Sequence, residues 1–405
     1  MKVCFYRPFS YPLFDPSAPG QFGGAEVRAV TLAKGLAQQG NCQVAFIVDS
    51  DHCRPSRDFG EIEVHFQSPH GRNGRATDRP GVSSALQGMS ARLLRSVRKR
   101  LRYPQSESLS LLSNINADVY CCFGATEASV DIVRAASRLK AQTVLFLVWD
   151  KELARDCVPS IVVGKQRRRI QRARDEVLHS ADQIVVQTEA QQQRLWRRFS
   201  RQASWIRNPI DLQIPTASAG KQPGRYALWV GRADTFHKRP DRCFELARRC
   251  AQVPFMLVMN RANYAGYAQL LEQAPANVSI VEQVPYPQMD EYFARARVLV
   301  NTSDVEGFPN TFLQAAKHGL PILSYAMDPD GVLETHGCGL LAHASLDAMG
   351  NQLERIWGGG AEIEVMSRNA RDYVATHHNL VDKVRELEVV LGLGSTTNLP
   401  AVHAA

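Results

Sequence analysis

Short runs of consecutive apolar residues alternate along the first half of the chain with longer segments in which apolar residues recur every three or four positions. The apolar runs are VCFY, QVAFIV, ADVYCCF, TVLFLV and DQIVVQ. Runs that are apolar throughout are typical of strands buried on both faces of a parallel sheet, and the intervening periodicity is typical of helices. The helices are expected at about residues 25–39, 125–139 and 165–179. The first half therefore predicts an α/β domain with a doubly wound sheet.

The second half repeats this alternation after a connection rich in proline, glycine and serine, residues 204–224. Its apolar runs are YALWVG, PFMLVMN, VSIVEQ and VLVNT, and its helices are expected at about 240–251, 264–273, 288–296 and 311–318. A last amphipathic helix is expected near 380–391. Two Rossmann-like doubly wound domains are thus predicted, facing each other across a cleft in which a ligand would bind.

The expected boundaries follow from these segments. Residues 1–205 form the first domain, 206–378 the second, 379–395 a C-terminal helix that packs back on the first domain, and 396–405 a tail. The first domain contains an insertion near 51–114. Its residues 51–88 are rich in glycine, proline, arginine and serine and predict a long, mobile excursion.

Composition narrows the class of protein. With 405 residues, 44% hydrophobic and 22% charged, the chain has the composition of a globular protein with two cores. No run of about 18 apolar residues and no signal peptide is evident, so we expect a cytoplasmic protein. The 9 cysteines are scattered without a CxxC pair, which favours reduced thiols. We predict no metal ligands and no cofactor.

The net charge of +8 is concentrated in two segments, residues 90–103 and 165–174. A helix over 90–103 would place leucine and valine on one side and basic residues on the others. Two interpretations are open: the helix packs its apolar side on the domain, or it lies on an anionic membrane, at the inner face, as a peripheral contact. We expect no nucleic-acid binding, because neither segment interleaves aromatic residues with its charge. The residues concerned are Leu93, Leu94, Val97 and Leu101, and Arg92, Arg95, Lys99 and Arg102.

Three loops that leave the carboxyl ends of predicted strands carry the candidate chemistry. In QFGGAEVRAV, Gly23 and Gly24 open the first helix, where they either make a tight turn or let a phosphate approach free backbone N–H groups. In WVGRADTFHKRPD, Arg232 and Lys238 are either solvated cations or a clamp for a diphosphate. In VEGFPNTFLQAAKHGLPIL, Glu306 lies between a buried strand and a helix, where an acid either caps the helix or faces a ligand.

The ordered combination of these loops resembles the family 4 glycosyltransferases, which have the GT-B fold and a retaining mechanism. GGAE opens the first helix, NPID at 208–211 enters the second domain, GR is followed by a lysine, and EGFPNTFLQA spans 306–315. The resemblance covers roughly residues 1–50 and 115–395. It implies a hexosyltransferase-type enzyme of polysaccharide or glycoconjugate biosynthesis. Its partners would be a nucleotide-sugar donor and a glycan, lipid-linked or small-molecule acceptor.

The resemblance also implies roles for single residues. Glu306 would face the donor sugar, and Arg232 and Lys238 would bind the diphosphate and neutralise charge as the sugar–phosphate bond breaks. Backbone amides of the loop after Glu306 would reach the donor from the second domain, and Gly23 and Gly24 would contact the donor from the first. The loop residues concerned are Gly307, Phe308, Pro309, Asn310 and Thr311.

Two positions depart from the family pattern. The family's second acid, eight residues after Glu306, is here Gln314, whose amide would meet the donor ribose without a charge. A His-Asp pair near the sugar is replaced by Trp149 and Asp150, which we regard as sugar or acceptor contacts; Trp149 offers a stacking surface but no proton transfer. These departures keep a second interpretation open, a non-catalytic nucleotide-sugar sensor or assembly partner of the same fold. A nucleotide-sugar epimerase of this fold is a third.

Overall fold

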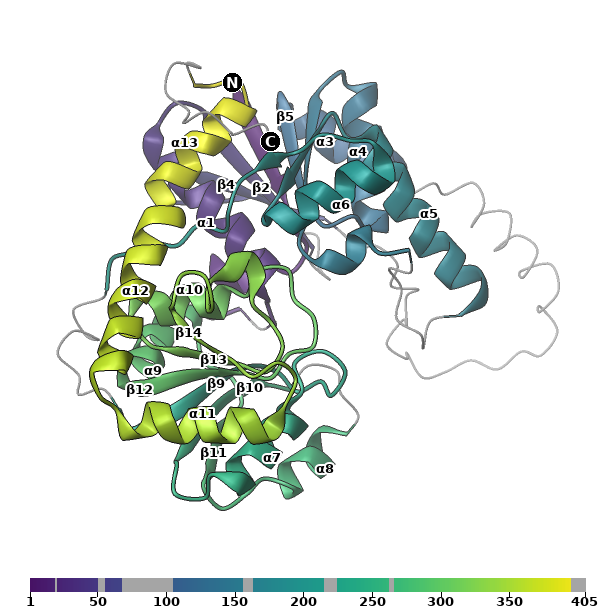
Figure 1. Cartoon of the computed structure of the whole chain (residues 1–405). Helices are drawn as coiled ribbons and strands as arrows, with labels where there is room; N and C mark the ends of the chain where they lie inside the picture. Colours follow the sequence, from purple (N-terminus) through teal and green to yellow (C-terminus); the bar gives the residue numbers. More distant parts are fainter. Residues whose placement is uncertain are drawn as a thin grey trace, which may run out of the picture.

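The computed structural model describes residues 1–18, 20–49, 55–67, 105–155, 163–214, 224–261 and 266–394. Two domains are stacked one above the other, and each is a mostly parallel sheet covered by helices on both faces (Figure 1). This arrangement confirms the predicted fold class. The basic segment 90–103 and the tail 396–405 lie outside the described residues.

The first sheet has the strand order β3-β4-β2-β1-β5-β6-β7-β8, and every neighbouring pair is parallel except β3 and β4. Its central strands β1, β2, β5, β6 and β7 are largely apolar because helices cover both faces: α1 lies on one face, and α3, α4 and α5 lie on the other. The strands are β1 (Lys2–Tyr6), β2 (Gln43–Asp49), β3 (Arg57–Phe59), β4 (Ile62–Gln67), β5 (Val119–Phe123), β6 (Gln142–Phe146), β7 (Gln183–Val186) and β8 (Ser204–Trp205). The helices are α1 (Gly24–Gln39), α3 (Gln105–Ile115), α4 (Glu127–Arg138), α5 (Gly164–Ser180) and α6 (Glu189–Phe199), with short 3-10 helices η1 (Tyr11–Leu13) and η2 (Asp150–Leu153).

Strands β3 and β4 correct the prediction of a mobile excursion over residues 51–88, which is wrong for 57–67. In β4 the residues Ile62, Val64 and Phe66 are buried and alternate with half-buried polar residues. This alternation is typical of a strand that is covered more fully on one face. The many glycine, proline and arginine residues nearby mask such a short pattern in the sequence.

The second sheet is fully parallel, with the order β11-β10-β9-β12-β13-β14. Helices α9, α10 and α12 pack on one face, and α7, α8 and α11 pack on the other. The strands are β9 (Tyr226–Arg232), β10 (Phe255–Asn260), β11 (Val278–Val281), β12 (Ala296–Asn301), β13 (Ile322–Ser324) and β14 (Gly339–Leu341). The helices are α7 (Pro240–Arg249), α8 (Tyr267–Glu272), α9 (Met289–Arg295), α10 (Asn310–Lys317), α11 (Leu346–Gly358) and α12 (Ala361–His377), with η3 (Tyr286–Gln288) and η4 (Pro329–Gly331).

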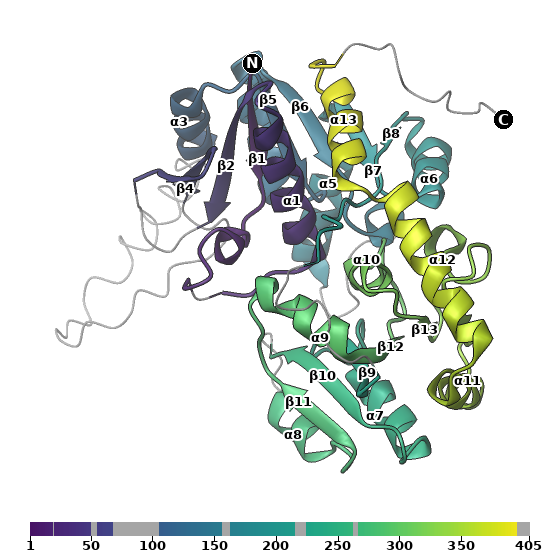
Figure 2. The ribbon, with the colours of Figure 1, turned by 90° about the vertical axis from the view of Figure 1, so that its left-hand side faces the viewer.

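The chain crosses between the domains twice, and the two crossings are paired. The backbone N–H of Ile210 donates to the His378 carbonyl at 2.8 Å, and the N–H of Leu380 donates to the Ile210 carbonyl at 3.1 Å. Beyond the second crossing, α13 (Leu380–Val390) packs against α1 and buries Val384 and Leu387 in the core of the first domain (Figure 2). Residues near both chain ends thus complete the first domain.

His378 lies fully buried at this double crossing. Its Nδ1–H donates to the Asn208 carbonyl at 2.7 Å, and its Nε2 lies 3.3 Å from the Tyr373 hydroxyl. Burial lowers the pKa of His378 well below its ordinary value, and the nearby Arg207 lowers it further, while the bond to Asn208 opposes this shift. The imidazole is therefore neutral in the folded protein at neutral pH.

We expect the protein to lose stability as the pH falls below about 6.5, the ordinary pKa of histidine. The unfolded chain then takes up a proton at His378 before the folded protein does, so acid favours unfolding. Between pH 6.5 and 5 this histidine accounts for about 2 kcal/mol of the loss. Urea unfolding measured across this range should show a shallower pH slope for His378→Gln, whereas the exposed His343→Ala should keep the wild-type slope. Equal slopes for His378→Gln and the wild type would contradict the assignment.

Candidate functional site

The two strands at the switch point of the second sheet supply the predicted cation pair and acid. From β9 the chain builds the sheet in one direction through β10 and β11, then returns to β12 on the other side of β9. Ligands of doubly wound sheets bind at the carboxyl ends of such neighbouring strands. Arg232 ends β9, Lys238 follows in the next loop, and Glu306 lies in the loop after β12.

Glu306 is surrounded by groups that stabilise its charge. Its Oε1 forms an ion pair with Lys238 Nζ and accepts a 2.8 Å hydrogen bond from Ser303 Oγ, and its Oε2 lies 3.8 Å from His237 Nε2. Its side chain is only 11% exposed. Burial by itself raises the pKa of this carboxyl, but Lys238, His237 and Ser303 together more than offset burial and leave the pKa below its ordinary value. Glu306 is therefore a carboxylate held ready for hydrogen-bond donors.

Hydrogen bonds of Asp234 and Thr302 with the backbone fix the loop that carries Lys238. Asp234 Oδ1 accepts hydrogen bonds from the backbone N–H groups of His237 and Lys238, at 2.8 and 2.9 Å. Thr302 Oγ1 accepts from Trp229 Nε1 at 2.8 Å and can donate to the Lys238 carbonyl at 2.9 Å. These contacts hold Lys238 against the end of β12 and leave its ammonium beside Glu306.

Arg232 is held less tightly than Lys238. Its side chain is 52% exposed, with Nε 3.6 Å from Asp234 Oδ2 and Nη2 3.4 Å from His237 Nδ1. Burial lowers the pKa of His237, and Glu306 only partly opposes this shift. An exposed guanidinium above a fixed lysine is suited to a ligand that carries two phosphates.

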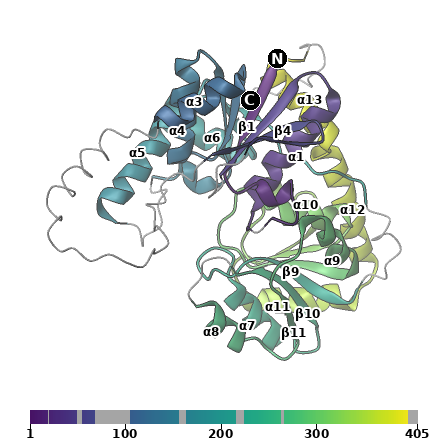
Figure 3. The same ribbon diagram turned by 180° about the vertical axis from the view of Figure 1, so that it is seen from behind.

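The N-terminus of α10 meets the N-terminus of α1 across the domain boundary. Asn310 Nδ2 donates to the Gly24 carbonyl at 2.8 Å, and Asn208 Nδ2 donates to Asn310 Oδ1 at 2.8 Å. Helix α10 lies on the side of the second domain that faces the first (Figure 3). Because each helix N-terminus carries free N–H groups and a partial positive charge, the pair favours an anion.

The remaining predicted residues of this segment differ in their surroundings. Phe308 is buried beside His378, with 4.8 Å between ring centres, and its carbonyl accepts from Asn208 Nδ2 at 3.1 Å. Pro309 is also buried, while Thr311 and Gln314 are half-buried on α10. Among the residues with a described position, none hydrogen-bonds to the Gln314 amide. Gln314 is thus available to a ligand at this end of α10.

The glycine loop of the first domain has an internal acceptor for one of its amides. The N–H of Gly23 donates to Glu26 Oε2 at 2.8 Å, and Glu26 Oε1 accepts from Arg7 Nε at 2.6 Å. Arg7 also donates to the Phe123 carbonyl at 2.8 Å. Arg7 and Glu26 were not predicted from the sequence. The amides that point out of the helix for an anion therefore begin at Gly24.

Trp149 and Asp150 lie after β6 in the first domain, and Asp150 is held by α6. Its Oδ2 pairs with Arg194 Nη1 at 2.7 Å, and its Oδ1 accepts from Gln191 Nε2 at 3.0 Å. The buried Glu152 accepts from the N–H groups of Val148 and Trp149 at 2.7 and 3.2 Å and so fixes this loop. The half-buried Trp149 ring lies 5.7 Å from Lys151 Nζ.

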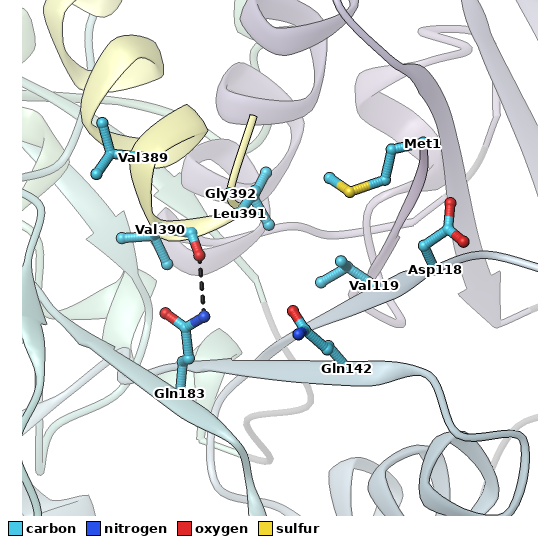
Figure 4. Close-up of a pocket in the computed structure, with 9 residues that line it drawn as sticks. All are labelled: Met1, Asp118, Val119, Gln142, Gln183, Val389, Val390, Leu391 and Gly392. Carbon is cyan, nitrogen blue, oxygen red and sulfur yellow. Dashed lines mark hydrogen bonds between the residues drawn. The ribbon is translucent and has the colours of Figure 1, made fainter. Parts of the chain in front are cut away.

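A separate hollow of about 770 Å³ lies at the amino edge of the first sheet (Figure 4). Gln183 Nε2 donates to the Val390 carbonyl across it at 3.0 Å. Ligands of doubly wound sheets bind at the carboxyl ends of the strands, so we do not place the site in this hollow. Its lining residues are Met1, Asp118, Val119, Gln142, Gln183, Val389, Val390, Leu391 and Gly392.

Neither a metal site nor a membrane-spanning helix is found in the described ranges. No group of three or more His, Cys, Asp or Glu side chains there has the arrangement of a metal site. None of the described helices combines the length and apolarity that crossing a bilayer requires.

One protein-family model matches a segment of the second domain. Residues 224–358 match the family model described as "Glycosyl transferases group 1", and this stretch includes Arg232, Lys238 and Glu306. A comparison with curated protein sequences finds no match.

Solved structures match almost the whole chain. A sucrose-phosphate synthase from Thermosynechococcus elongatus is 17% identical, with 97% of this chain and 98% of that chain covered and a TM-score of 0.70. A glycosyltransferase from Rickettsia africae is 11% identical, with 97% and 98% covered and a TM-score of 0.64. WaaG, described as a glycosyltransferase involved in lipopolysaccharide biosynthesis, is 16% identical, with 96% and 100% covered and a TM-score of 0.62. These similarities establish the GT-B fold.

Proposed function

We propose that this chain, a glycosyltransferase of group 1, transfers a sugar from a nucleotide diphosphate sugar to an acceptor hydroxyl and retains the anomeric configuration. The observation that carries this proposal is the Glu306–Lys238 ion pair at the switch point of the second sheet, beside the paired N-termini of α1 and α10. On this proposal the carboxylate binds sugar hydroxyls, and the nearby helix N-termini bind a phosphate.

Each charged residue has a distinct task in this proposal. Lys238 and Arg232 bind the diphosphate, and Lys238 remains in contact with Glu306, which accepts hydrogen bonds from the sugar. The acceptor oxygen forms a bond to the anomeric carbon while the bond from that carbon to the phosphate oxygen breaks. The leaving phosphate takes up the proton of the acceptor hydroxyl. The two cations stabilise the charge that grows on this phosphate.

A panel of UDP-, GDP- and ADP-sugars tests the proposal. We expect one of them to raise the melting temperature of the purified protein, and its nucleoside diphosphate to be released, slowly with water and faster with a glycan acceptor. Stabilisation without any release would instead favour a sensor that binds nucleotide sugars. If no member of the panel stabilises the protein and none is hydrolysed, the proposal is contradicted.

Gln314→Glu restores the acid that the family carries at this position. If the Gln314 amide meets the donor ribose, a carboxylate there should accept stronger hydrogen bonds from the ribose hydroxyls. We expect the dissociation constant of the nucleotide diphosphate to fall about threefold to tenfold, because charge-assisted hydrogen bonds are stronger than neutral ones. Isothermal titration calorimetry measures this change. Unchanged or weaker binding would argue against the ribose contact.

The acceptor and the location stay predictions. We propose a glycan acceptor, and WaaG, one of the similar structures, is named for lipopolysaccharide biosynthesis. A cytoplasmic protein with a peripheral membrane contact through residues 90–103 would pellet with anionic vesicles at low salt and be released as the salt concentration rises. Equal pelleting with neutral vesicles would contradict that contact.

A further inference from the structure

The loop of residues 306–310 contacts both domains, residue by residue. Glu306 pairs with Lys238 of the second domain, whereas Asn310 donates to the Gly24 carbonyl of the first. Phe308 packs on His378 at the double crossing. Gly307, next to Glu306, lies against Gln187 and Val148, which follow β7 and β6 of the first domain. The residue beside the sugar-binding acid is therefore in direct contact with the opposite domain.

A side chain at position 307 would clash with the first domain unless Gln187 and the Val148 backbone moved aside. A methyl group at position 307 would lie 2.5 Å from Gln187 Nε2, 3.2 Å from Gln187 Cδ and 3.0 Å from the Val148 carbonyl oxygen. The 2.5 Å contact forces the Gln187 amide to move, and the 3.0 Å contact requires the Val148 backbone to give by a few tenths of an ångström. The φ angle of Gly307 is outside the left-handed region, so the backbone itself does not require glycine there. The requirement comes from the approach of the first domain.

The two residues that face Gly307 are held in place. The Gln187 backbone N–H donates to Gln191 Oε1 at 3.0 Å, and the Gln187 carbonyl accepts from Trp205 Nε1 at 3.1 Å. The Gln187 side chain is buried, which limits how far its amide can swing away. The N–H of Val148 donates to Glu152 Oε2 at 2.7 Å. The backbones of both residues cannot move far without breaking these bonds, whereas the Gln187 amide nitrogen makes no hydrogen bond to the described residues and is confined by burial alone.

We propose that Gly307 is a positioning residue that lets the first domain close on the donor-binding loop, with Gln187 and Val148 as its docking surface. This inference rests on the proposed transferase function. Closure at Gly307 sets the distance between Glu306 and the loop of Trp149 and Asp150, because Val148 belongs to that loop. A side chain at position 307 therefore holds the acceptor side away from the donor without touching the donor contacts of the second domain.

The kinetic test uses paired substitutions. Gly307→Ala should lower kcat at least tenfold while the KM of the donor changes less than threefold. The reason is that the donor contacts of the second domain are kept, whereas closure of the first domain on the second is hindered. Adding Gln187→Ala removes two of the three close contacts and should raise the kcat of Gly307→Ala at least threefold. Gly358→Ala is the matched control, because nothing lies within 4 Å of a methyl group at that position. An unchanged kcat for Gly307→Ala, or no recovery in the double variant, would overturn the proposal.

A second measurement does not depend on turnover. Small-angle X-ray scattering should give a larger radius of gyration for Gly307→Ala than for the wild type, and the double variant with Gln187→Ala should return toward the wild-type value. If the wild type turns over no sugar nucleotide but the radii change in this way, the proposed function fails and the docking role stands. Equal radii for the wild type and Gly307→Ala, together with equal kcat, would remove the docking role and leave the transferase function intact.

Discussion

Replacing Lys238 by alanine should lower the kcat/KM of the donor by about 100-fold to 1,000-fold, the range found when a single donor group to a developing oxyanion is removed. One charge-assisted hydrogen bond to the diphosphate accounts for about 1.5 to 3 kcal/mol of binding. The remaining loss comes from the transition state, in which charge grows on the leaving phosphate beside the missing ammonium. Glu306, only 11% exposed, would in addition lose its ion-pair partner.

Steady-state kinetics and calorimetry with the nucleoside diphosphate measure the two parts of this effect. Arg355→Ala is a suitable control, because Arg355 forms an ion pair with Glu362 on the surface of the same domain. It should change neither quantity more than about twofold. A kcat/KM for Lys238→Ala within threefold of the wild type would show that the diphosphate binds elsewhere.

Glu306→Gln should abolish measurable sugar transfer and also destabilise the second domain. The amide keeps the size of the side chain but removes the charge, so Lys238 and His237 are left without their carboxylate. Breaking a largely buried pair in this way costs up to about 3 kcal/mol, since the Lys238 side chain retains some contact with solvent. Thermal unfolding and the rate of nucleotide release measure the two effects.

The pH dependence of this variant has a definite sign. The pKa of Glu306 is below its ordinary value in the folded protein, so its carboxylate stabilises the wild type above the ordinary pKa, and this contribution is lost as the pH falls through the lowered pKa. The stability difference between wild type and Glu306→Gln should therefore shrink below about pH 4.5. Adding Lys238→Met should cost less than it does in the wild type, because the lysine has already lost its partner. Strictly additive losses would contradict the pairing.

The alternation of strands and helices could be predicted from the sequence, because short runs that are apolar throughout are typical of strands buried on both faces of a parallel sheet. Val298, Leu299 and Val300 form the centre of β12, and Pro240 begins α7, as expected from the fixed φ of proline. The alternating strand β4 was hidden by its neighbours. Helices α11 and α12 were missed, since the sequence pattern predicted no element for most residues between 324 and 379.

Arg232, Lys238 and Glu306 could be chosen from the sequence because each follows the end of a predicted strand, and the family resemblance of the ordered motifs implied their roles and those of the uncharged residues. Neither signal predicts contacts such as that between Gly24 and Asn310, which are 286 positions apart. His237 and Ser303 were missed because their role depends on the fold of two separate loops around Glu306; the only available signal was the position of His237 beside Lys238.

The double crossing makes the first domain discontinuous in the sequence. Because α13 completes the core over α1, the first domain is made from two distant pieces of chain, and the second domain is inserted between them. The two ends of this inserted part are joined by hydrogen bonds at Ile210. A fragment ending at residue 205 would leave the α1 surface around Gly35 uncovered, where a methyl group would already touch Val384. Exchange of the second domain with that of another protein of this fold should therefore be made at the paired crossings, so that α13 stays with α1.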